Sequence, residues 1–411
     1  MNRRIRIANL ALFVVCAAVF SSSLRGTTAW LDRFSESLVW GTPDGFLQLQ
    51  GEVVLDLEIH SIDKYPPGLI FGDDGVIHHP RLTLVFDAFA GDNLYAFAKI
   101  RADNGFDVGY HPPGQARFDE YFLQISAPGG GLHLRAGTFG TVFGNWVGRH
   151  DSWENPFINA PIPYERVTAV FDGRVLPGPA AFLLVQNIPD VKERWVPVIW
   201  GPVYTAGAGV FVEQRGLDFA LTVKNAALSS RPTIWNDISF ENPTFTGRIG
   251  YAPNEAWGLG LSASTGPYLI PTVARRLPEG ASVGDFDQST VGLDMSWARG
   301  HLQIWGEVIA SEFEIPNVGD AGTLNYYIES RYKWHPRFFT ALRWGQQFFG
   351  EIDNGSGGPE KWDRGVSRID LAATYRLDRH LQVKVQYSFS NQYGELEQGR
   401  HYAAAQFTLK F

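Results

Sequence analysis

The sequence predicts an all-β protein, a transmembrane antiparallel up-and-down β-barrel of about 18 strands, on three observations. Short segments in which apolar and polar residues alternate recur along the chain, as in strands with one apolar and one polar face. Short turns alternate with long connections, as in the hairpins of a membrane-spanning barrel. The chain also begins with a segment typical of exported proteins and ends on an aromatic residue, Phe411.

The composition is too polar for a bundle of membrane-spanning helices. The chain has 411 residues, of which 45% are hydrophobic and 19% charged, and its mean hydropathy is -0.13. Its net charge is -8, with both signs spread along the sequence. Because no basic block or stripe occurs that would collect phosphates, nucleic acid is not an expected partner.

The first 29 residues read as a cleaved signal peptide for Sec export. Arg3, Arg4 and Arg6 precede a mostly apolar run over residues 7–20, and small and polar residues follow to Ala29. The run is shorter than the roughly 20 apolar residues that span a bilayer. We therefore expect one barrel domain over residues 30–411. The single cysteine, Cys16, lies in the removed part, so the mature chain has neither thiol nor disulfide.

The segment 46–59 illustrates the alternation. One face carries Leu47, Leu49, Val53, Leu55, Leu57 and Ile59, and the other carries Gln48, Gln50, Glu52, Asp56 and Glu58. The same pattern recurs near the end of the chain, at 368–377 and 381–390. Such strands suit a wall with lipid on one side and water on the other.

The connections support closure into a ring. The predicted short turns are Ala90–Asn93, Ala127–Gly131, Asp172–Pro179, Arg215–Gly216, Ala252–Ala256, Ala298–Gly300, Trp334–Pro336 and Leu377–His380, and longer connections, such as Glu312–Gly322, lie between them. With both termini in the periplasm the count is eighteen strands. The alternative is sixteen, because the hairpin Arg166–Asn187 has the weakest alternation. A secreted β-sandwich or propeller is the soluble alternative, but it does not predict this interleaving of turns and loops.

Aromatic residues at strand ends predict the two interfacial belts of a membrane barrel. The expected members are Tyr121, Trp297, Tyr332, Trp334, Trp344, Tyr375 and Tyr402. The adjacent His78 and His79 are also interpreted as interfacial residues. No metal-binding spacing occurs in the sequence, and no cofactor is expected.

The last segment, 402–411, resembles the C-terminal strand of Gram-negative outer-membrane β-barrel proteins. Phe407, Leu409 and the terminal Phe411 share one face of it. The resemblance implies a location in the cell outer membrane. It also implies that these residues form an assembly signal for the barrel-assembly machinery, with outer-membrane lipid as a further partner.

A second stretch resembles porins of the phosphate-selective O and P type. It contains Leu132, the segments 137–140 and 142–144, and the Pro-Ile-Pro-Tyr sequence at 161–164. The resemblance implies a homotrimeric channel. The basic residues of a phosphate site are not matched, so this substrate does not carry over.

Barrels of 16 to 18 strands usually leave an aqueous lumen, so a water-filled pore is expected. The expected pore-lining residues are Lys99, Arg101, Glu120, Arg135, Glu329, Arg331, Lys333, Arg343, Arg368, Asp370, Arg376 and Lys384. Such charges set ion preference, or else pair across neighbouring strands as a solvated wall. Since both signs are well represented, the ion selectivity stays open.

The loop 138–164 is the expected constriction, because long loops without strands of their own are often functional. It combines charge with aromatic bulk in Trp146, Arg149, His150, Asp151, Trp153 and Glu154. The alternative is an external cap against lipopolysaccharide or a neighbouring subunit.

The sequence therefore predicts a porin, a passive diffusion channel for small hydrophilic solutes or ions, and not an enzyme. A plugged or substrate-specific transporter is one alternative, and a structural anchor barrel is another. An outer-membrane hydrolase is the third, with Ser388, Ser390 and His401 as the nearest candidates for a catalytic group.

Overall fold

The computed structural model describes residues 28–62, 75–104, 114–187, 195–231, 239–393 and 399–411. The predicted signal segment, with Cys16, lies almost entirely outside these residues. No helix in the described part of the chain has the length and apolar character needed to cross a membrane.

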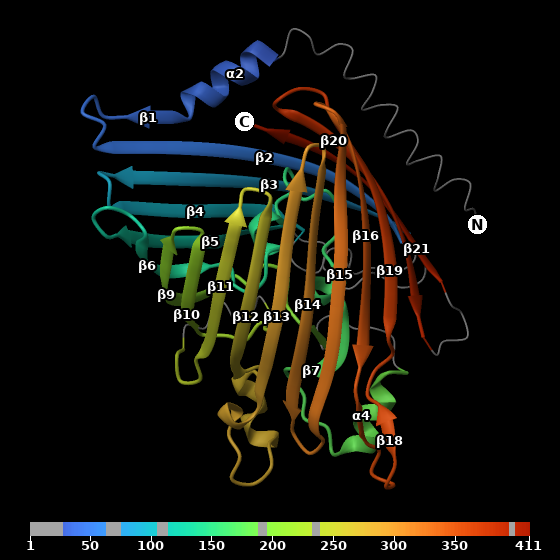
Figure 1. Ribbon diagram of the computed structural model, residues 1–411. Coiled ribbons are helices and arrows are strands. Elements are labelled where there is room, and N and C mark those ends of the chain that lie inside the picture. The colour runs from blue at the N-terminus through green and yellow to red at the C-terminus, as the bar shows by residue number, and fades with distance from the viewer. Residues whose placement is uncertain (1–27, 63–74, 105–113, 188–194, 232–238, 394–398) are drawn as a thin grey trace.

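Sixteen antiparallel strands form a closed up-and-down barrel (Figure 1). Each strand pairs with its neighbours along the chain, and the last strand pairs with the first to close the ring. The strands are β2 (Leu47–Ile62), β3 (Gly75–Ala90), β4 (Leu94–Asp103), β5 (Gln115–Ser126), β6 (Leu132–Phe139), β9 (Thr205–Gln214), β10 (Leu217–Lys224), β11 (Thr244–Asn254), β12 (Trp257–Pro267), β13 (Asp287–Arg299), β14 (Leu302–Ile315), β15 (Gly319–His335), β16 (Phe338–Phe349), β19 (Val366–Arg376), β20 (Leu381–Gln392) and β21 (Arg400–Lys410).

The wall has its apolar residues outside and its polar residues inside, the reverse of a soluble protein. On β2, Leu57 is 39% exposed on the outer face, while its neighbour Asp56 is 1% exposed on the inner face. Across the barrel, Leu371 and Asp370 of β19 show the same contrast. Since every strand is also paired on both sides, the barrel can cross lipid without an open edge.

The ring closes between β2 and β21. Residues 54–62 of β2 pair with β21, and residues 48–50 pair with the short strand β1 (Val39–Gly41). Phe411 and Val53 exchange two backbone hydrogen bonds of 2.6 and 2.9 Å. The helix α2 (Thr28–Ser37) precedes β1, and its Phe34 lies edge-on to Phe411 with 4.8 Å between ring centroids.

The lower of the two expected strand counts is the observed one. Residues 166–187, expected as a spanning hairpin, form β7 (Val167–Phe171) and the helix α4 (Pro179–Val185). All five residues of β7 are buried, so this strand has no lipid-facing side. The turn predicted at Asp172–Pro179 is therefore not a barrel turn.

The connection predicted at Glu312–Gly322 is also shorter than expected. The strands β14 and β15 extend to Ile315 and from Gly319, so the turn comprises residues 316–318. Asn317 takes the left-handed conformation there, with φ of 63°. Residues 312–315 and 319–322, which were expected in the loop, instead continue the two paired strands.

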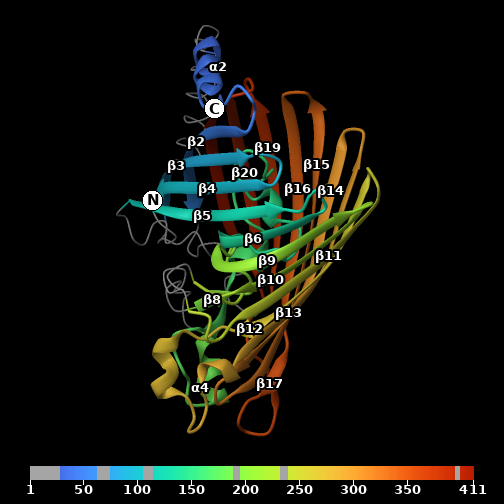
Figure 2. The same ribbon diagram turned by 90° about the vertical axis from the view of Figure 1, so that its left-hand side faces the viewer.

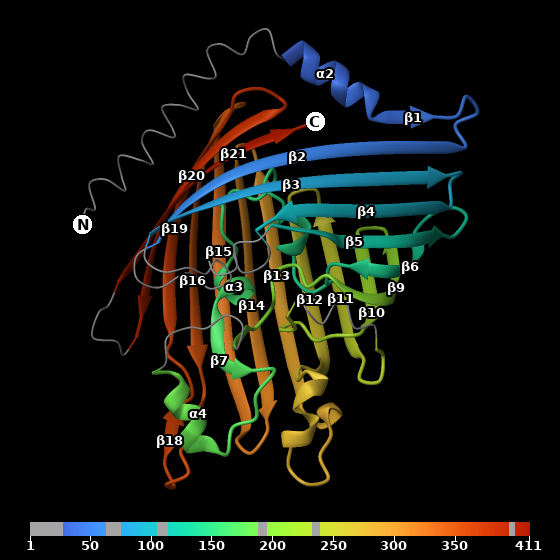
Figure 3. The ribbon, with the colours of Figure 1, turned by 180° about the vertical axis from the view of Figure 1, so that it is seen from behind.

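Between β6 and β9 the chain leaves the wall and enters the barrel (Figure 3). We call the described residues 140–187 and 195–204 the interior segment. Besides β7 and α4, it contains η2 (Val147–Arg149), α3 (Ile162–Glu165) and β8 (Trp195–Pro197), which pairs with β7. Seen from the side, the segment lies inside the ring, between the β2–β6 part of the wall and the β12–β19 part (Figure 2).

An apolar core joins the far end of the interior segment to the longer loops. Phe182 of α4 stacks on Trp362, whose side chain is fully buried. The helices η4 (Pro271–Arg276) and η5 (Val283–Asp285) contribute Val273 and Val283. The hairpin of β17 (Glu351–Asp353) and β18 (Pro359–Lys361) contributes Ile352. This end of the barrel is therefore covered by packed protein on the β12–β19 side.

Two predicted interfacial residues lie elsewhere. Tyr402 is 5% exposed and faces the interior. It lies on the same face of β21 as Ala404 and Gln406, whose side chains also point inward. His79 is buried on the inner face of β3, while His78 is exposed on the outer face. The interfacial interpretation is therefore wrong for Tyr402 and His79.

Candidate functional site

The interior segment is anchored first to Glu307 of β14. Glu307 accepts hydrogen bonds from the backbone N–H groups of Asn145 and Trp146 at 2.6 and 3.0 Å. Its second carboxylate oxygen accepts the hydroxyl of Tyr164 at 2.7 Å. Three donors from the interior segment thus converge on one buried carboxylate of the wall.

Gly144 permits this approach. Its φ is +70°, a conformation that side chains disfavour. A Cβ atom built there would lie 2.5 Å from the Tyr164 hydroxyl and 2.7 Å from the Glu307 carboxylate. A larger residue would therefore push the interior segment away from β14.

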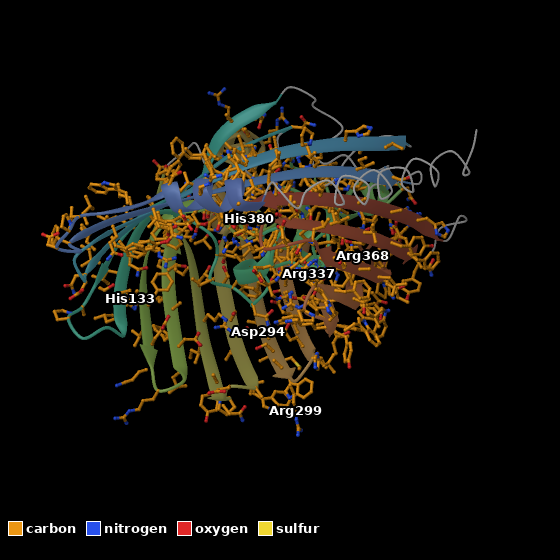
Figure 4. All side chains as sticks on the ribbon, turned by 90° about the horizontal axis from the view of Figure 1, so that it is seen from above. His133, Asp294, Arg299, Arg337, Arg368 and His380 are labelled. Carbon is orange, nitrogen blue, oxygen red and sulfur yellow. The ribbon has the colours of Figure 1, made fainter. Side chains whose placement is uncertain are left out.

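A buried ionic cluster makes the second attachment. Arg343 of β16 donates to Asp370 of β19 at 2.7 Å and to the side-chain oxygen of Asn159 at 2.5 Å. Arg368 of β19 also contacts Asp370, at 3.1 Å, and pairs with Glu165 of the interior segment. Arg343 and Arg368 are 1% and 4% exposed, so neither faces open water (Figure 4 labels Arg368 in the view from above).

Lys384 of β20 makes the third attachment. Its ammonium donates to the carbonyl oxygens of Ser152 and Asn155 at 2.9 and 2.6 Å. On β15, Glu329 accepts a hydrogen bond from Arg149 of the interior segment. A buried lysine or glutamate is stable in such places because its charge is matched by fixed dipoles or an opposite charge.

Five of the twelve residues expected on the pore wall are therefore covered by the interior segment. They do point inward, as the alternation indicates, but protein and not water meets them. They are Glu329, Arg343, Arg368, Asp370 and Lys384. For these five residues the structure contradicts a water-exposed position, and the reason is the insertion between β6 and β9. Lys99 is equally little exposed, at 4%, because its ammonium is paired with Asp151 of the interior segment.

On the opposite side of the interior segment a cavity of about 150 Å³ remains. Its wall side comes from β2, β3, β4 and the end of β21, and its other side from residues 150–154. The lining residues are Glu52, Val54, Asp56, Arg81, Thr83, Val85, Lys99, Arg101, His150, Asp151, Ser152, Trp153, Glu154 and Lys410. Lys99, Arg101 and four of the six residues expected at a constriction thus meet around one space.

The charges in this cavity are balanced. Four basic and four acidic side chains line it. Lys99 lies 3.0 Å from Asp151 across the cavity, and Lys410 lies 2.7 Å from Glu52 along the wall. Arg81 binds Asp56 at 2.9 Å. No single sign of charge dominates the surface of the cavity.

His150 lies at the edge of the cavity as a neutral imidazole. Burial lowers its pKa to about 4, and the positive charges of Lys99 and Arg101 lower it further against the opposing effect of Asp151. Its two ring nitrogens contact the carbonyl of Val147 at 2.5 Å and the hydroxyl of Tyr204 at 2.7 Å. Both contacts are satisfied by a neutral ring that donates once and accepts once.

The remaining expected residues lie around the cavity without lining it. Glu120 accepts the backbone N–H of Gly140 at 3.2 Å. Arg135 packs against Phe122 and Phe211, with its guanidinium carbon 4.2 and 4.5 Å from the ring centroids.

Nearer the short turns, arginine side chains stack on rings of the wall and of the interior segment. Arg331 lies over Trp305, and Arg376 lies over Trp153 at 5.0 Å. Lys333 is exposed close to the turn after β15. Within the interior segment, Trp146 is buried against Tyr164, with 4.7 Å between ring centroids.

Sequence reasoning missed Asp119. A register shift between β4 and β5 places Lys99 opposite Glu120 and Ile100 opposite Phe118, so Asp119 is the extra residue of a bulge. Its fully buried carboxylate lies 3.0 Å from Arg101 and 2.8 Å from Arg117. Strict alternation could not reveal this, because a bulge shifts the parity of the residues beyond it.

A cluster of one carboxylate and two imidazoles was also missed. Glu58 and His60 of β2 and His79 of β3 are buried together on the inner face, with their ligand atoms within 4.8 Å of one another. The alternation that places Glu58 inside also places His60 there. For His79, the alternation of inward and outward residues along β3 is the signal that could have revealed its inward position.

The residues proposed for a hydrolase do not come together. Ser388 pairs with Tyr402 on the inner face, while His401 faces outward and contacts the hydroxyl of Tyr387 at 2.6 Å. A different pair, Ser126 and His133, does form a 2.8 Å contact beside the turn between β5 and β6. That pair lines none of the three cavities described in the structure.

No family model matches the chain, and no curated protein matches its sequence. Solved structures do match its fold. An anion-selective porin from Comamonas acidovorans is 12% identical, with a TM-score of 0.57 over 89% of this chain and 100% of that one. The channel DcaP of Acinetobacter baumannii is 10% identical, with a TM-score of 0.55 over 90% and 99%. The trimer form of OmpT, an outer-membrane protein of Vibrio cholerae, is 8% identical, with a TM-score of 0.56 over 89% and 99%. At these identities the likeness concerns the fold, and it places this chain among proteins with the architecture of outer-membrane β-barrels.

Proposed function

We propose that this protein is an outer-membrane porin, a passive channel for small hydrophilic solutes and ions. The observation that carries the proposal is the charged cavity between the β2–β4 wall and residues 150–154. A polar space in a barrel with an apolar outer face is what a solute needs to cross lipid. The similar folds of an anion-selective porin and of the outer-membrane channel DcaP support the proposal.

The route is narrow and runs along one side of the lumen. The interior segment packs against β14, β15, β16, β19 and β20 and leaves the described cavity on the side of β2, β3 and β4. We therefore propose that residues 150–154 form the constriction, with Lys99 and Arg101 opposite them. A cavity of about 150 Å³ has room for an ion or a small solute.

We propose weak ion selectivity. The four basic and four acidic side chains on the cavity surface offer neither sign a clear advantage. The finer resemblance to phosphate-selective porins has no further support, because the stretch that carries it forms the entry of the interior segment and the α3 region. Inorganic phosphate is therefore not the solute that we propose.

The biological setting follows from the same proposal. We propose that residues 1–29 are removed after Sec export and that both termini lie in the periplasm. The outward-facing Phe407 and Leu409 of β21, together with the terminal Phe411, would serve the barrel-assembly machinery of a Gram-negative cell. A homotrimer is consistent with the trimer form of the Vibrio cholerae protein.

Single-channel recording tests the proposal. The purified protein is inserted into planar bilayers, and current steps and the reversal potential are measured under a salt gradient. We expect stable steps of small conductance and a reversal potential near zero. Silent insertion of a barrel that is folded by circular dichroism would overturn the proposal.

A gated or substrate-specific transporter is the second candidate, and the burial of the interior segment favours it. Under that alternative the wild-type protein is silent, and variants that release the interior segment conduct. We do not propose an enzyme, since Ser388 and His401 lie on opposite faces of the wall.

A further inference from the structure

The strands that close the barrel hold a compact group of possible metal ligands. Glu58, His60 and His79 are 4%, 0% and 7% exposed. One carboxylate oxygen of Glu58, Oε2, lies 3.2 Å from Nε2 of His60 and 3.3 Å from Nδ1 of His79. Ligand atoms bound about 2.0–2.1 Å from a tetrahedral zinc ion are about 3.3 Å apart. The two distances from Glu58 match the edges of such a site, and all three ligand atoms lie within 4.8 Å of one another.

The surrounding contacts orient Glu58 for this role. Its other oxygen, Oε1, accepts hydrogen bonds from Arg81 at 2.8 Å and from Gln406 at 2.5 Å. Those two donors fix the carboxylate and leave Oε2 facing the two imidazoles. Neighbours that fix a ligand in this way are usual around protein metal sites.

Both histidines have a suitable group on the side away from Glu58. Nδ1 of His60 lies 2.9 Å from the hydroxyl of Tyr402, and Nε2 of His79 lies 3.9 Å from a carboxylate oxygen of Asp103. Among the described residues, Nε2 of His79 has no hydrogen-bond partner, although the ring is buried. A metal on Nδ1 would make Nε2 an N–H donor aimed toward Asp103, which gives this orphaned nitrogen a role.

The local charge also suits a cation. The ionised groups contacting one another here are Asp56, Glu58, Arg81, Arg101, Asp103, Arg117 and Asp119. Four of these are carboxylates and three are guanidiniums. With neutral imidazoles this ion-paired group has a net charge of -1, and the ammonium of Lys384, which interacts with Asp56 and Glu58, brings the sum to 0. A divalent ion therefore meets no net positive charge here.

We propose that Glu58, His60 and His79 bind one divalent transition-metal ion, with Zn²⁺ as the representative, and leave a fourth coordination position open. Two imidazoles and one carboxylate select such an ion over Mg²⁺ or Ca²⁺, which prefer oxygen ligands. The ion joins β2 to β3 beside the strand that closes the ring, β21. Tyr402 and Gln406 of β21 contact His60 and Glu58, so the ion is also connected to the closing strand and stabilises the closure of the barrel.

The test is metal binding by the full mature protein, without an affinity tag, in detergent. After chelation and dialysis, Zn²⁺ content is measured by atomic emission, and Co²⁺ is added as an optical probe. We expect one ion per chain, visible absorption bands of low-symmetry Co²⁺, and a higher thermal unfolding temperature with Zn²⁺. A wild-type protein that retains no metal and gives no Co²⁺ bands overturns the proposal.

Two adjacent histidines provide a matched pair of variants. His79→Gln removes a ligand and is expected to abolish stoichiometric binding, whereas His78→Gln alters the exposed neighbour on the lipid side and is expected to bind like wild type. Tyr402→Phe is expected to weaken affinity about 10–100-fold, the usual effect of losing an outer partner. Equal binding by His79→Gln and wild type would place any ion elsewhere and refute the site.

Folding and channel activity are separated from this result. Each variant is checked by circular dichroism and by the gel shift that heating produces in folded barrels. If His79→Gln does not fold, X-ray absorption on the Zn²⁺-loaded wild-type protein decides, because a first shell without two imidazoles excludes the site. Metal binding in detergent does not depend on conductance, so failure of the porin proposal would leave this test unaffected.

Discussion

Lys99 and Arg101 on β4 face a cavity, whereas Arg343 and Arg368 on β16 and β19 lie beneath the interior segment. All four are basic residues at inward positions of alternating strands. On the β2–β4 side Lys99 and Arg101 line the remaining cavity, where Lys99 is 4% exposed and paired with Asp151. On the β16–β20 side the same kind of charge holds the interior segment in place. Inward orientation thus follows from the strand, but exposure to water depends on a segment inserted elsewhere in the chain.

The largest expected effect comes from breaking the buried ionic cluster. Arg368→Met leaves Glu165 without its guanidinium partner and leaves Asp370 with only Arg343. Loss of one partner from a buried ion pair costs about 3–5 kcal/mol of stability. We expect the interior segment to loosen, with faster proteolysis within residues 140–204 and larger conductance steps.

The control for this variant is Arg337→Met, in the exposed turn between β15 and β16. It is expected to behave like wild type in both assays. Unchanged proteolysis and conductance in Arg368→Met would show that the cluster does not hold the segment.

The second effect is a pH dependence due to His150, which lies where the interior segment meets the cavity. Its folded pKa of about 4 is below the ordinary 6.5, so the unfolded chain binds the proton more readily. Stability from the neutral ring is complete above pH 6.5 and is lost as the pH falls toward 4. The loss is about 3 kcal/mol at most.

This is measured as the difference in unfolding free energy between the wild type and His150→Gln, in urea at pH 7 and pH 4. The difference should shrink at pH 4. His301→Gln, at an exposed turn position, should show no such change. A difference that stays constant would mean that His150 titrates normally in the folded protein.

A smaller effect is expected at the first attachment. Glu307→Gln keeps the shape but removes the charge that accepts hydrogen bonds from Asn145, Trp146 and Tyr164. A hydrogen bond to a charged group contributes about 1.5–3 kcal/mol to stability. The free energy of local opening of the interior segment should therefore fall by a similar amount.

Hydrogen exchange of the amides of Asn145 and Trp146 measures this opening. Glu312→Gln is the matched control, because it lies on the outer, exposed face of the same strand. Equal protection in Glu307→Gln and wild type would exclude the carboxylate as an anchor.

The smallest effect is on selectivity. Lys99→Met removes one positive charge from the cavity, and one charge about 6 Å from an ion in a water-like medium contributes about 0.7 kcal/mol. That corresponds to about a threefold shift of the permeability ratio toward cations. Lys361→Met, in the exposed hairpin of β17 and β18, should leave the reversal potential unchanged. An unchanged potential in Lys99→Met would place the conducting route elsewhere.

The barrel was predictable because lipid and water impose opposite demands on the two faces of each strand. Most turns, the inward position of the charged residues and the outward position of Phe407 follow from that period of two. The strand count was less certain, since β7 is a buried strand without alternation and α4 is a short apolar helix. Neither element is part of the barrel wall. From the sequence alone, a short apolar segment packed inside the lumen looks the same as a short apolar segment that faces lipid.

The candidate site was predictable only in part. Loop length and composition pointed to residues 146–154, and four of these residues do line the cavity. The partners on β14, β16, β19 and β20 could not be predicted, because contacts such as Arg343 with Asn159 join residues far apart in the chain. The bulge at Asp119 and the inward orientation of the His79 side chain depend on strand register, which cannot be derived from a single sequence.

The passage of solutes along the β2–β4 side of the lumen can be tested by chemical block of introduced cysteines. Thr83 on β3 lines the cavity, and Thr374 on β19 is an inward residue buried on the opposite side. The sequence contains one cysteine, Cys16, in the segment that we propose is removed, so each introduced thiol would be alone. We predict that a charged thiol reagent blocks current through Thr83→Cys and leaves Thr374→Cys open. Block of Thr374→Cys with no effect on Thr83→Cys would contradict it.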